Sequence, residues 1–268
     1  MVLPLLNLIS RNQSIILLNR RGKMSQILEK LLEERHFGLK GGLLHKTQIN
    51  LTYNSNRIEG SKLSEEQTRY IFETKTVGFD ADGLSVDDII ETSNHFRCFD
   101  YMLDSISESL SSKVIKELHR LLKIGTSDSY KAYFNVGDWK KLPNVVGNVE
   151  TTAPEEVEEE IQELIERYNN LPLKTFDDIV TFHFQFESIH PFQDGNGRVG
   201  RLIMFRECLK NDVVPFILTD EMKLFYYRGL SEFNHEKGYL IDTCRAAQDT
   251  YKSWLKYFYP TMTLKDID

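Results

Sequence analysis

Residues 176–189 are the stretch that most limits the folds this chain can adopt. Read as a helix, FDDIVTFHFQFESI carries apolar side chains in most directions around its axis. A helix that is apolar on most sides has to be covered by other elements. Thr175, with Asp178 three residues later, is a capping signature for its start. Pro191 disfavours helical backbone at the residue before it, so we expect the helix to end at His190.

Most of the remaining chain also repeats its apolar residues at helical spacing. The pattern extends over residues 24–35, 63–74, 84–106 and 111–122. Helices that bury one another form an all-helical domain. The sequence therefore predicts an all-α fold.

Residues 130–151 break the helical pattern. YKAYFNVGDWKKLPNVVGNVET mixes aromatic and β-branched residues with Gly137, Pro143 and Gly147. Turn-forming residues between such side chains are typical of a short β-hairpin or an extended flap. We therefore expect one β excursion in the all-α fold.

An acidic stretch, TAPEEVEEEIQELIERY, follows this region. Thr152 and Glu155 make a capping signature, and an apolar stripe continues behind them over residues 157–165. The glutamates then lie on the solvated face of an amphipathic helix. This interpretation needs no cationic partner.

Composition and charge disfavour several classes of function. The chain has 268 residues and a formal net charge of −7, and the absence of a basic stripe argues against nucleic-acid binding. No apolar run reaches the ~18 residues that a membrane-spanning helix needs. Three widely spaced cysteines, Cys98, Cys208 and Cys244, favour a reducing compartment. We expect a cytoplasmic protein in which these cysteines are small buried side chains.

The chain divides into three parts. Residues 1–23 are interpreted as a disordered leader, or as sequence ahead of a true start at Met24, because their apolar runs are short and no cleavage site follows. Residues 24–85 form an N-terminal helical region. Residues 86–268 form the core with its C-terminal helices.

The segment HPFQDGNGRVGR, which follows residue 189, is a polar loop between two apolar helices. It enters the second helix at its N-terminus, where unpaired N–H groups and the macrodipole favour an anion. Gly195 and Gly197 allow a phosphate to approach the backbone closely. Arg198 and Arg201 lie on one side of the new helix and can fork around phosphate oxygens.

Two further residues of this loop complete a site for phosphate chemistry. Asp194 offers a hard carboxylate oxygen, which Mg²⁺ binds together with substrate phosphates. His190 titrates near neutrality and can accept a proton from a hydroxyl. The loop therefore predicts the attack of a hydroxyl on a nucleotide phosphate.

The loop matches the signature H-x-F-x-[D/E]-G-N-G-R-x-x-R at every defined position, so the chain resembles the Fic-domain family over about residues 90–245. The resemblance implies an all-helical core with a β-hairpin flap. It also implies transfer of AMP from ATP to a protein hydroxyl, with Mg²⁺. Gly197 disfavours the family's kinases, which carry lysine there, and phosphocholine transfer stays open.

The resemblance assigns a role to each loop residue. His190 would be the general base, Phe192 would anchor the loop in the core, and Asp194 would hold Mg²⁺. The nucleotide would be bound by Gly195, Asn196, Gly197, Arg198 and Arg201, with Arg201 reaching the γ-phosphate. Tyr226 and Tyr227 fall where relatives line the adenine pocket, although plain packing accounts for them equally well. The hairpin, at about residues 135–146, would hold the target by strand addition.

A second motif precedes the core. Ser55, Glu59 and Gly60, in SNRIEG, match [S/T]-x-x-x-E-[G/N], the inhibitory-helix motif of the same family. We expect it on a helix over about residues 45–60. Glu59 would then pair with Arg201 and occupy the guanidinium that the γ-phosphate needs.

The leading hypothesis is a self-inhibited protein adenylyltransferase that uses ATP and Mg²⁺ and modifies a target protein, with self-modification left open. Glu59 equally permits the opposite reaction, removal of AMP from a modified protein. A nucleotide-binding regulatory module without catalysis is the third hypothesis, which the intact His190 and Asp194 disfavour. A homodimer is left open, and neither a nucleic acid nor a membrane is expected as a partner.

Overall fold

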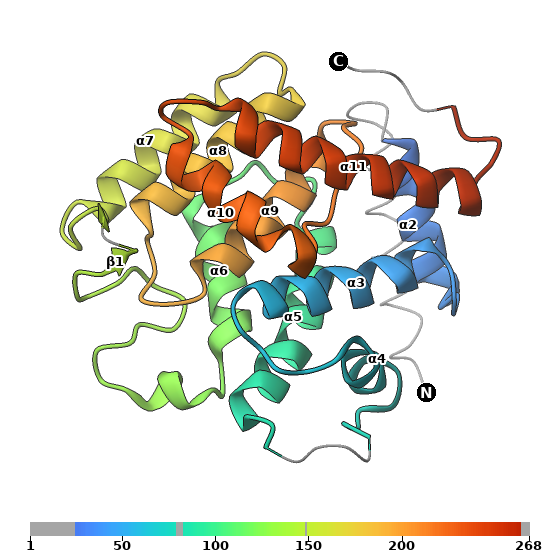
Figure 1. The fold of residues 1–268 in the computed structure, drawn as a ribbon, viewed down its shortest axis with the longest axis horizontal. Helices are drawn as coiled ribbons and strands as arrows, with labels where there is room; N and C mark the ends of the chain where they lie inside the picture. Colours follow the sequence, from blue (N-terminus) through green and yellow to red (C-terminus); the bar gives the residue numbers. More distant parts are fainter. Residues whose placement is uncertain (1–24, 79–82, 148, 264–268) are drawn as a thin grey trace, which may run out of the picture.

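The computed structural model describes residues 25–78, 83–147 and 149–263. The predicted leader, residues 1–23, lies outside these ranges. Within them the chain is mostly helical, and the all-α prediction is confirmed (Figure 1). No helix of the described residues is long and apolar enough to cross a membrane.

The described elements are eight helices and two 3₁₀ turns around one central pair of helices, with one small hairpin. The central pair is α8 (Phe176–Ile189) and α9 (Asn196–Lys210). The helices before it are α2 (Gln26–Phe37), α3 (Leu43–Ile58), α4 (Glu65–Thr74), α5 (Val86–Asp104), α6 (Ser112–Lys123) and α7 (Val157–Asn169). The helices after it are α10 (Lys223–Glu232) and α11 (Gly238–Phe258). The 3₁₀ turns are η1 (Ser127–Tyr130) and η2 (Asp220–Met222), and the strands are β1 (Val145–Val146) and β2 (Val149–Glu150).

Helix α9 lies at the centre, and nearly all of its residues are buried, the charged Arg198, Arg201, Arg206 and Glu207 included. It contacts α2, α3, α5, α6 and α8, and Val199, Leu202 and Cys208 are fully buried. A helix that is buried on nearly every side has to be covered by several other helices. Its N-terminus, with the polar loop, is therefore held inside the molecule. All three cysteines are free and buried, as expected.

Helix α8 begins and ends where the sequence predicted. The Thr175 hydroxyl accepts a hydrogen bond from the Asp178 N–H at 3.2 Å, and the Asp178 carboxylate accepts one from the Thr175 N–H at 2.9 Å. This reciprocal pair is the predicted capping box. The helix ends at Ile189, and His190 follows it as the C-terminal cap.

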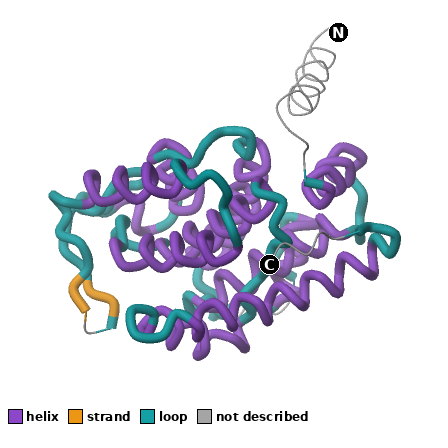
Figure 2. Tube along the Cα trace, turned by 90° about the horizontal axis from the view of Figure 1, so that it is seen from above, coloured by secondary structure: helices purple, strands orange, loops and turns teal. Residues whose placement is uncertain are grey.

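The hairpin lies further along the chain than predicted. β1 and β2 pair in antiparallel register over residues 145–150, at one end of the helical body (Figure 2). Most of the predicted range, residues 135–146, is instead a turn structure. There the Asn135 amide donates to the Trp139 carbonyl, and the Gly137 N–H donates to His119. These bonds use backbone groups that a strand would have paired with a neighbouring strand.

The capping box predicted at Thr152 and Glu155 is wrong. Helix α7 begins at Val157, after the cap residue Glu156, and residues 154–156 form a turn. Pro154 keeps the preceding residue out of the helical region, which delays the start of the helix.

Helix α3 is capped by a side chain from another helix. Glu34, on α2, accepts hydrogen bonds from the N–H groups of Leu43 (3.0 Å) and Leu44 (2.6 Å) and from the Tyr259 hydroxyl. A carboxylate in this position satisfies unpaired amides and complements the macrodipole. An added Cβ at Gly42 would lie 2.5 Å from a carboxylate oxygen, so glycine permits the approach. The cap places α3, which carries the second motif.

We expect Glu34→Ala to lower the free energy of unfolding by about 2 kcal/mol, because it leaves two buried amides without their acceptor. Chemical denaturation of both proteins would measure the change. The matched control is Glu33→Ala on the same helix, whose exposed pair with Lys30 should contribute less than about 1 kcal/mol. Equal losses in the two variants would contradict a capping role for Glu34.

Candidate functional site

One side chain ties the polar loop to the start of α9. Asn196 accepts a hydrogen bond from the Phe192 N–H and donates one to the Phe192 carbonyl, both at 2.8 Å. The Phe192 ring is fully buried and stacks on His119, with ring centroids 3.9 Å apart. Phe192 thus anchors the loop, as the resemblance implied. The side chain of Asn196 is used within the loop, which leaves its backbone N–H for the predicted phosphate contact.

Two glycines open the first turn of α9. Gly195 has φ +88°, a left-handed conformation that glycine adopts easily. An added Cβ at Gly197 would overlap the Glu59 carboxylate and lie 2.8 Å from an Arg201 nitrogen. Gly197 therefore lets an anion reach this turn. In this structure the anion is Glu59.

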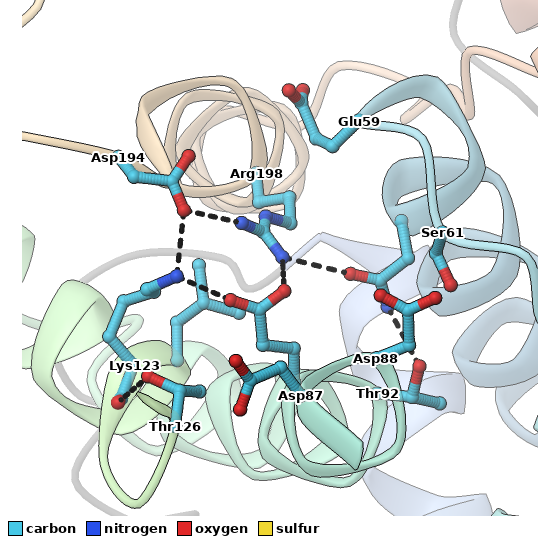
Figure 3. Close-up of polar contacts among 12 residues, drawn as sticks. Glu59, Ser61, Asp87, Asp88, Thr92, Lys123, Thr126, Asp194 and Arg198 are labelled. Atoms are coloured by element: carbon cyan, nitrogen blue, oxygen red, sulfur yellow. Dashed lines mark hydrogen bonds and ion pairs between the residues drawn. The ribbon is translucent and has the colours of Figure 1, made fainter. Parts of the chain in front are cut away.

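Asp194 lies beside two cations, Lys123 and Arg198 (Figure 3). Its Oδ2 is 2.7 Å from Lys123 Nζ and 3.3 Å from Arg198 Nη2. Burial alone would raise the pKa of Asp194, but Arg198 and Lys123 hold it well below its usual range. Both cations bind the same oxygen, and 49% of the side chain is exposed. The ionised carboxylate therefore fits the predicted Mg²⁺, which accepts one carboxylate ligand together with substrate phosphates.

The guanidinium of Arg198 faces acidic and amide oxygens. It binds Glu91 on α5, approaches Asp194 and lies 3.5 Å from the amide oxygen of Asn56. Its Nε is buried without a partner among the described residues. Arg198 therefore holds Asp194 in place. Its predicted contact with a phosphate would have to compete with these bonds.

The second motif meets the loop at Arg201. Arg201 Nη2 is 2.6 Å from Glu59 Oε1 and 2.9 Å from the Ser55 carbonyl oxygen, and Nε is 3.0 Å from the Ser55 hydroxyl. Helix α3 ends at Ile58, and Gly60, with φ +100°, turns the chain directly after Glu59. The predicted approach of Glu59 to Arg201 is present. It is a single ion pair and not a bidentate one.

His190 has a left-handed backbone, with φ +52°, which is uncommon outside glycine. Its Nδ1 lies 3.3 Å from the Glu187 carbonyl oxygen and 3.8 Å from the Glu187 carboxylate. Two acceptors near Nδ1 favour the tautomer protonated there, which leaves the Nε2 lone pair free. Burial lowers the pKa of His190, so the ring is neutral at pH 7.

Tyr226 and Tyr227, on α10, take different positions. Tyr227 is 40% exposed and donates a hydrogen bond to the Ile58 carbonyl at 3.2 Å. Tyr226 is buried, its hydroxyl lies 2.8 Å from His183 Nε2, and its ring centroid is 5.8 Å from the Arg201 guanidinium. Tyr227 therefore borders the site beside the end of α3, whereas Tyr226 packs beneath it.

Sequence reasoning missed three charged residues of this site: Glu91, Lys123 and Glu187. Glu187 precedes His190 by three residues, a spacing that brings the two side chains together at the end of a helix. That signal could have been found in the sequence. Glu91 and Lys123 come from α5 and α6 and reach the loop only through folding. No local pattern marks them.

Comparison with known families and proteins shows that the loop lies in a region that matches a known protein family. The model of the Fic/DOC family matches residues 109–208. "Protein adenylyltransferase fic-1" of Caenorhabditis elegans is 28% identical over 199 residues, and that of Caenorhabditis briggsae is 30% identical over 203 residues. These matches span 72% of this chain and 38% of each relative. "Protein adenylyltransferase Fic" of Nematostella vectensis is 26% identical over 225 residues, which is 78% of this chain and 51% of that protein.

Solved structures share the fold. Fic-1 from C. elegans superposes with a TM-score of 0.70 at 21% identity, covering 96% of this chain and 78% of that one. A Fic domain containing signaling protein from Bacteroides thetaiotaomicron superposes with a TM-score of 0.64 at 22% identity, covering 86% of this chain and 90% of that one. The fold, the family match and the complete loop signature agree. The chain contains a Fic domain, which matches the Fic/DOC family over residues 109–208.

Proposed function

We propose that this chain is a self-inhibited protein adenylyltransferase, which transfers AMP from ATP to a hydroxyl of a target protein. The observation that carries the proposal is the approach of Glu59 to Arg201 beside a complete phosphate-binding loop. The names of the adenylyltransferase relatives support the reaction. A module that only binds nucleotide would need neither a base such as His190 nor a carboxylate such as Asp194, which disfavours that alternative.

In the transfer step, the target hydroxyl attacks the α-phosphorus of ATP, and the bond to the bridging oxygen breaks as pyrophosphate leaves. Nε2 of His190 accepts the hydroxyl proton. The amides at the start of α9, opened by Gly195 and Gly197, stabilise charge on the α- and β-phosphates. Asp194 would hold Mg²⁺, which neutralises phosphate charge when bound. Arg201 would receive the γ-phosphate.

The hairpin supports docking of a protein target. Val145 is 63% exposed and Val146 is 49% exposed, although both are β-branched apolar residues on a strand. A two-residue strand with an open edge can pair with an extended segment through backbone hydrogen bonds. Such pairing reads little sequence, so several hydroxyl-bearing segments would be accepted.

Self-inhibition follows from competition for one buried cation. The Arg201 side chain is only 3% exposed, and a buried guanidinium is strongly destabilising without an anion. Glu59 supplies that anion here. A γ-phosphate would have to displace it, so ATP would bind in a pose unsuited to transfer.

We expect Glu59→Gly to raise AMP transfer by at least about tenfold, because a charge-assisted bond of about 1.5–3 kcal/mol no longer opposes the γ-phosphate. His190→Ala should abolish transfer in both backgrounds. The measurement is label on protein from ATP labelled at the α-phosphate, with lysate as the source of targets. Glu232→Gly, at the exposed end of α10, is the matched control and should change nothing. If Glu59→Gly is no more active than the unmodified chain, Glu59 is not the brake.

Removal of AMP is a second candidate, favoured by the 29% exposure of the Glu59 side chain. A partly exposed carboxylate beside the phosphate site can also orient a water molecule. Incubation with an AMP-modified target would decide. AMP release by the unmodified chain, lost in Glu59→Gln, would assign removal, and no release would leave transfer alone.

Glu187 is the acidic residue beside the proposed base, His190. Its Oε1 is buried without a hydrogen-bond partner among the described residues. Burial and the negative charge of Glu59 raise the pKa of Glu187 to about 8, although Arg201 opposes the shift. Glu187 is therefore mostly protonated at pH 7. At that pH the Glu187 carboxyl therefore carries no negative charge that would raise the pKa of His190.

This protonation makes stability depend on pH. The folded protein holds the Glu187 proton up to about pH 8, whereas the unfolded chain releases it near 4.5, so this group lowers the stability as pH rises between these values. We expect Glu187→Gln to remove that loss. Urea unfolding at pH 5 and pH 8 should show the variant gaining stability, relative to the unmodified chain, at the higher pH. A difference that does not change with pH would contradict the raised pKa.

A further inference from the structure

The ammonium group of Lys123 lies among three carboxylates. Lys123 is the last residue of α6, and its side chain is only 2% exposed. Its Nζ is 2.7 Å from Asp194 Oδ2 and 2.8 Å from Asp128 Oδ2, and it also binds Glu91. These acids come from the loop, from η1 and from α5. One side chain thus joins three separate parts of the fold.

Arg198 closes this arrangement into a ring. It binds Glu91 and Asp194, the same two acids that bind Lys123. Lys123, Asp194, Arg198 and Glu91 therefore alternate in charge around the ring. Figure 3 shows Asp194 between Lys123 and Arg198. Each oppositely charged pair limits the movement of the next. The carboxylate of Asp194 is oriented before any ligand arrives.

The three acids have the geometry of a cation site. One carboxylate oxygen from each of Glu91, Asp128 and Asp194 lies within 4.8 Å of the other two. Oxygen ligands at this spacing can surround a divalent ion. Here the place between them is taken by the Lys123 ammonium, which donates a hydrogen bond to each.

We propose that Lys123 is a positioning residue that stands in for a second cation beside Asp194, so that the chain binds one divalent ion and binds it together with the nucleotide. Enzymes of phosphate transfer often use two metal ions about 3.5–4 Å apart. In this chain the ammonium fills one of the two positions permanently. The part of the inference that concerns the nucleotide rests on the proposed function, and the part that concerns Lys123 does not.

The balance of charge explains why the metal would come with ATP. Three carboxylates face two buried cations, Lys123 and Arg198, and both cations share Asp194. A free divalent ion therefore meets a carboxylate whose charge is already largely neutralised, and two cations nearby repel it. The phosphates of ATP add negative charge on the exposed side of Asp194. Only then are there enough anionic ligands for the ion.

The experiment measures Mn²⁺ binding by electron paramagnetic resonance, with Mn²⁺ as the probe for Mg²⁺. The unmodified chain should bind one ion per chain in the presence of a non-hydrolysable ATP analogue and at least about tenfold more weakly without it. Equally tight binding without the analogue, or two ions with it, would overturn the proposal. This measurement uses the unmodified chain, so its result does not depend on whether a variant folds.

A variant tests Lys123 itself, without nucleotide. Lys123→Met should bind Mn²⁺ at least about tenfold more tightly than the unmodified chain, because the three carboxylates then lose the one cation that all of them share. The gain should disappear in Lys123→Met/Asp128→Asn, which removes one ligand and restores the charge balance. Lys131→Met is the matched control, since Lys131 also binds Asp128 (2.6 Å) but is exposed. Unchanged Mn²⁺ affinity in Lys123→Met would overturn the proposal.

The two proposals fail in distinguishable ways. Should Lys123→Met unfold without metal, its recovery of melting temperature on adding Mn²⁺ measures the same site. A protein that transfers no AMP, but whose Lys123→Met variant gains a Mn²⁺ site, would refute the proposed function and support the inference on Lys123. AMP transfer by the protein, together with no gain of a Mn²⁺ site in Lys123→Met, would support the proposed function and refute the inference on Lys123.

Discussion

The site depends on the burial of two arginines in the first turn of α9. Arg198 and Arg201 have side chains 5% and 3% exposed, and a guanidinium in such a place must have anions beside it. The unpaired amides of the same turn add to this demand for negative charge. Glu59 meets this demand at Arg201, and Asp194 and Glu91 meet it at Arg198.

The two arginines bind their anions differently. Arg198 has a structural role, whereas Arg201 is where we propose that regulation occurs. Arg198 is enclosed by Glu91 and Asp194, with Lys123 completing a ring that no ligand needs to open. Arg201 pairs with Glu59, which is partly exposed and stands at the end of α3, and one of its nitrogens has no partner among the described residues. Glu59 forms an ion pair with this one arginine, whereas Glu91 and Asp194 are each shared between Lys123 and Arg198, so a phosphate can replace Glu59 more easily. The proposed brake is therefore placed on the arginine whose anion can be exchanged.

Much of the fold could be predicted because its signals are local. The capping box of Thr175 and Asp178, which was predicted, acts over three residues. The errors also have local causes. Pro154 delays α7 beyond the predicted cap, and side-chain bonds such as that of Asn135 to Trp139 draw residues near 135–139 into turns, so the hairpin forms later. The periodicity of apolar residues predicts helices and strands, but it does not show which hydrogen bonds form within a loop.

The sequence by itself determined the helical class, the rigid loop and the kinds of group that the loop presents, because those properties arise from neighbours along the chain. Only the tertiary structure decided which charges meet. Lys123 and Asp194 are 71 residues apart, and no pattern predicted that they meet. Arg201 and Glu59 are 142 residues apart, and only the family resemblance predicted their pairing. Their contacts exist because α3 and α6 pack against α9, and the packing of helices depends on the shape of whole faces and not on any single spacing. Glu91 and Lys123 carry no signal of their role in the sequence, since their partners are brought to them by the burial of α9.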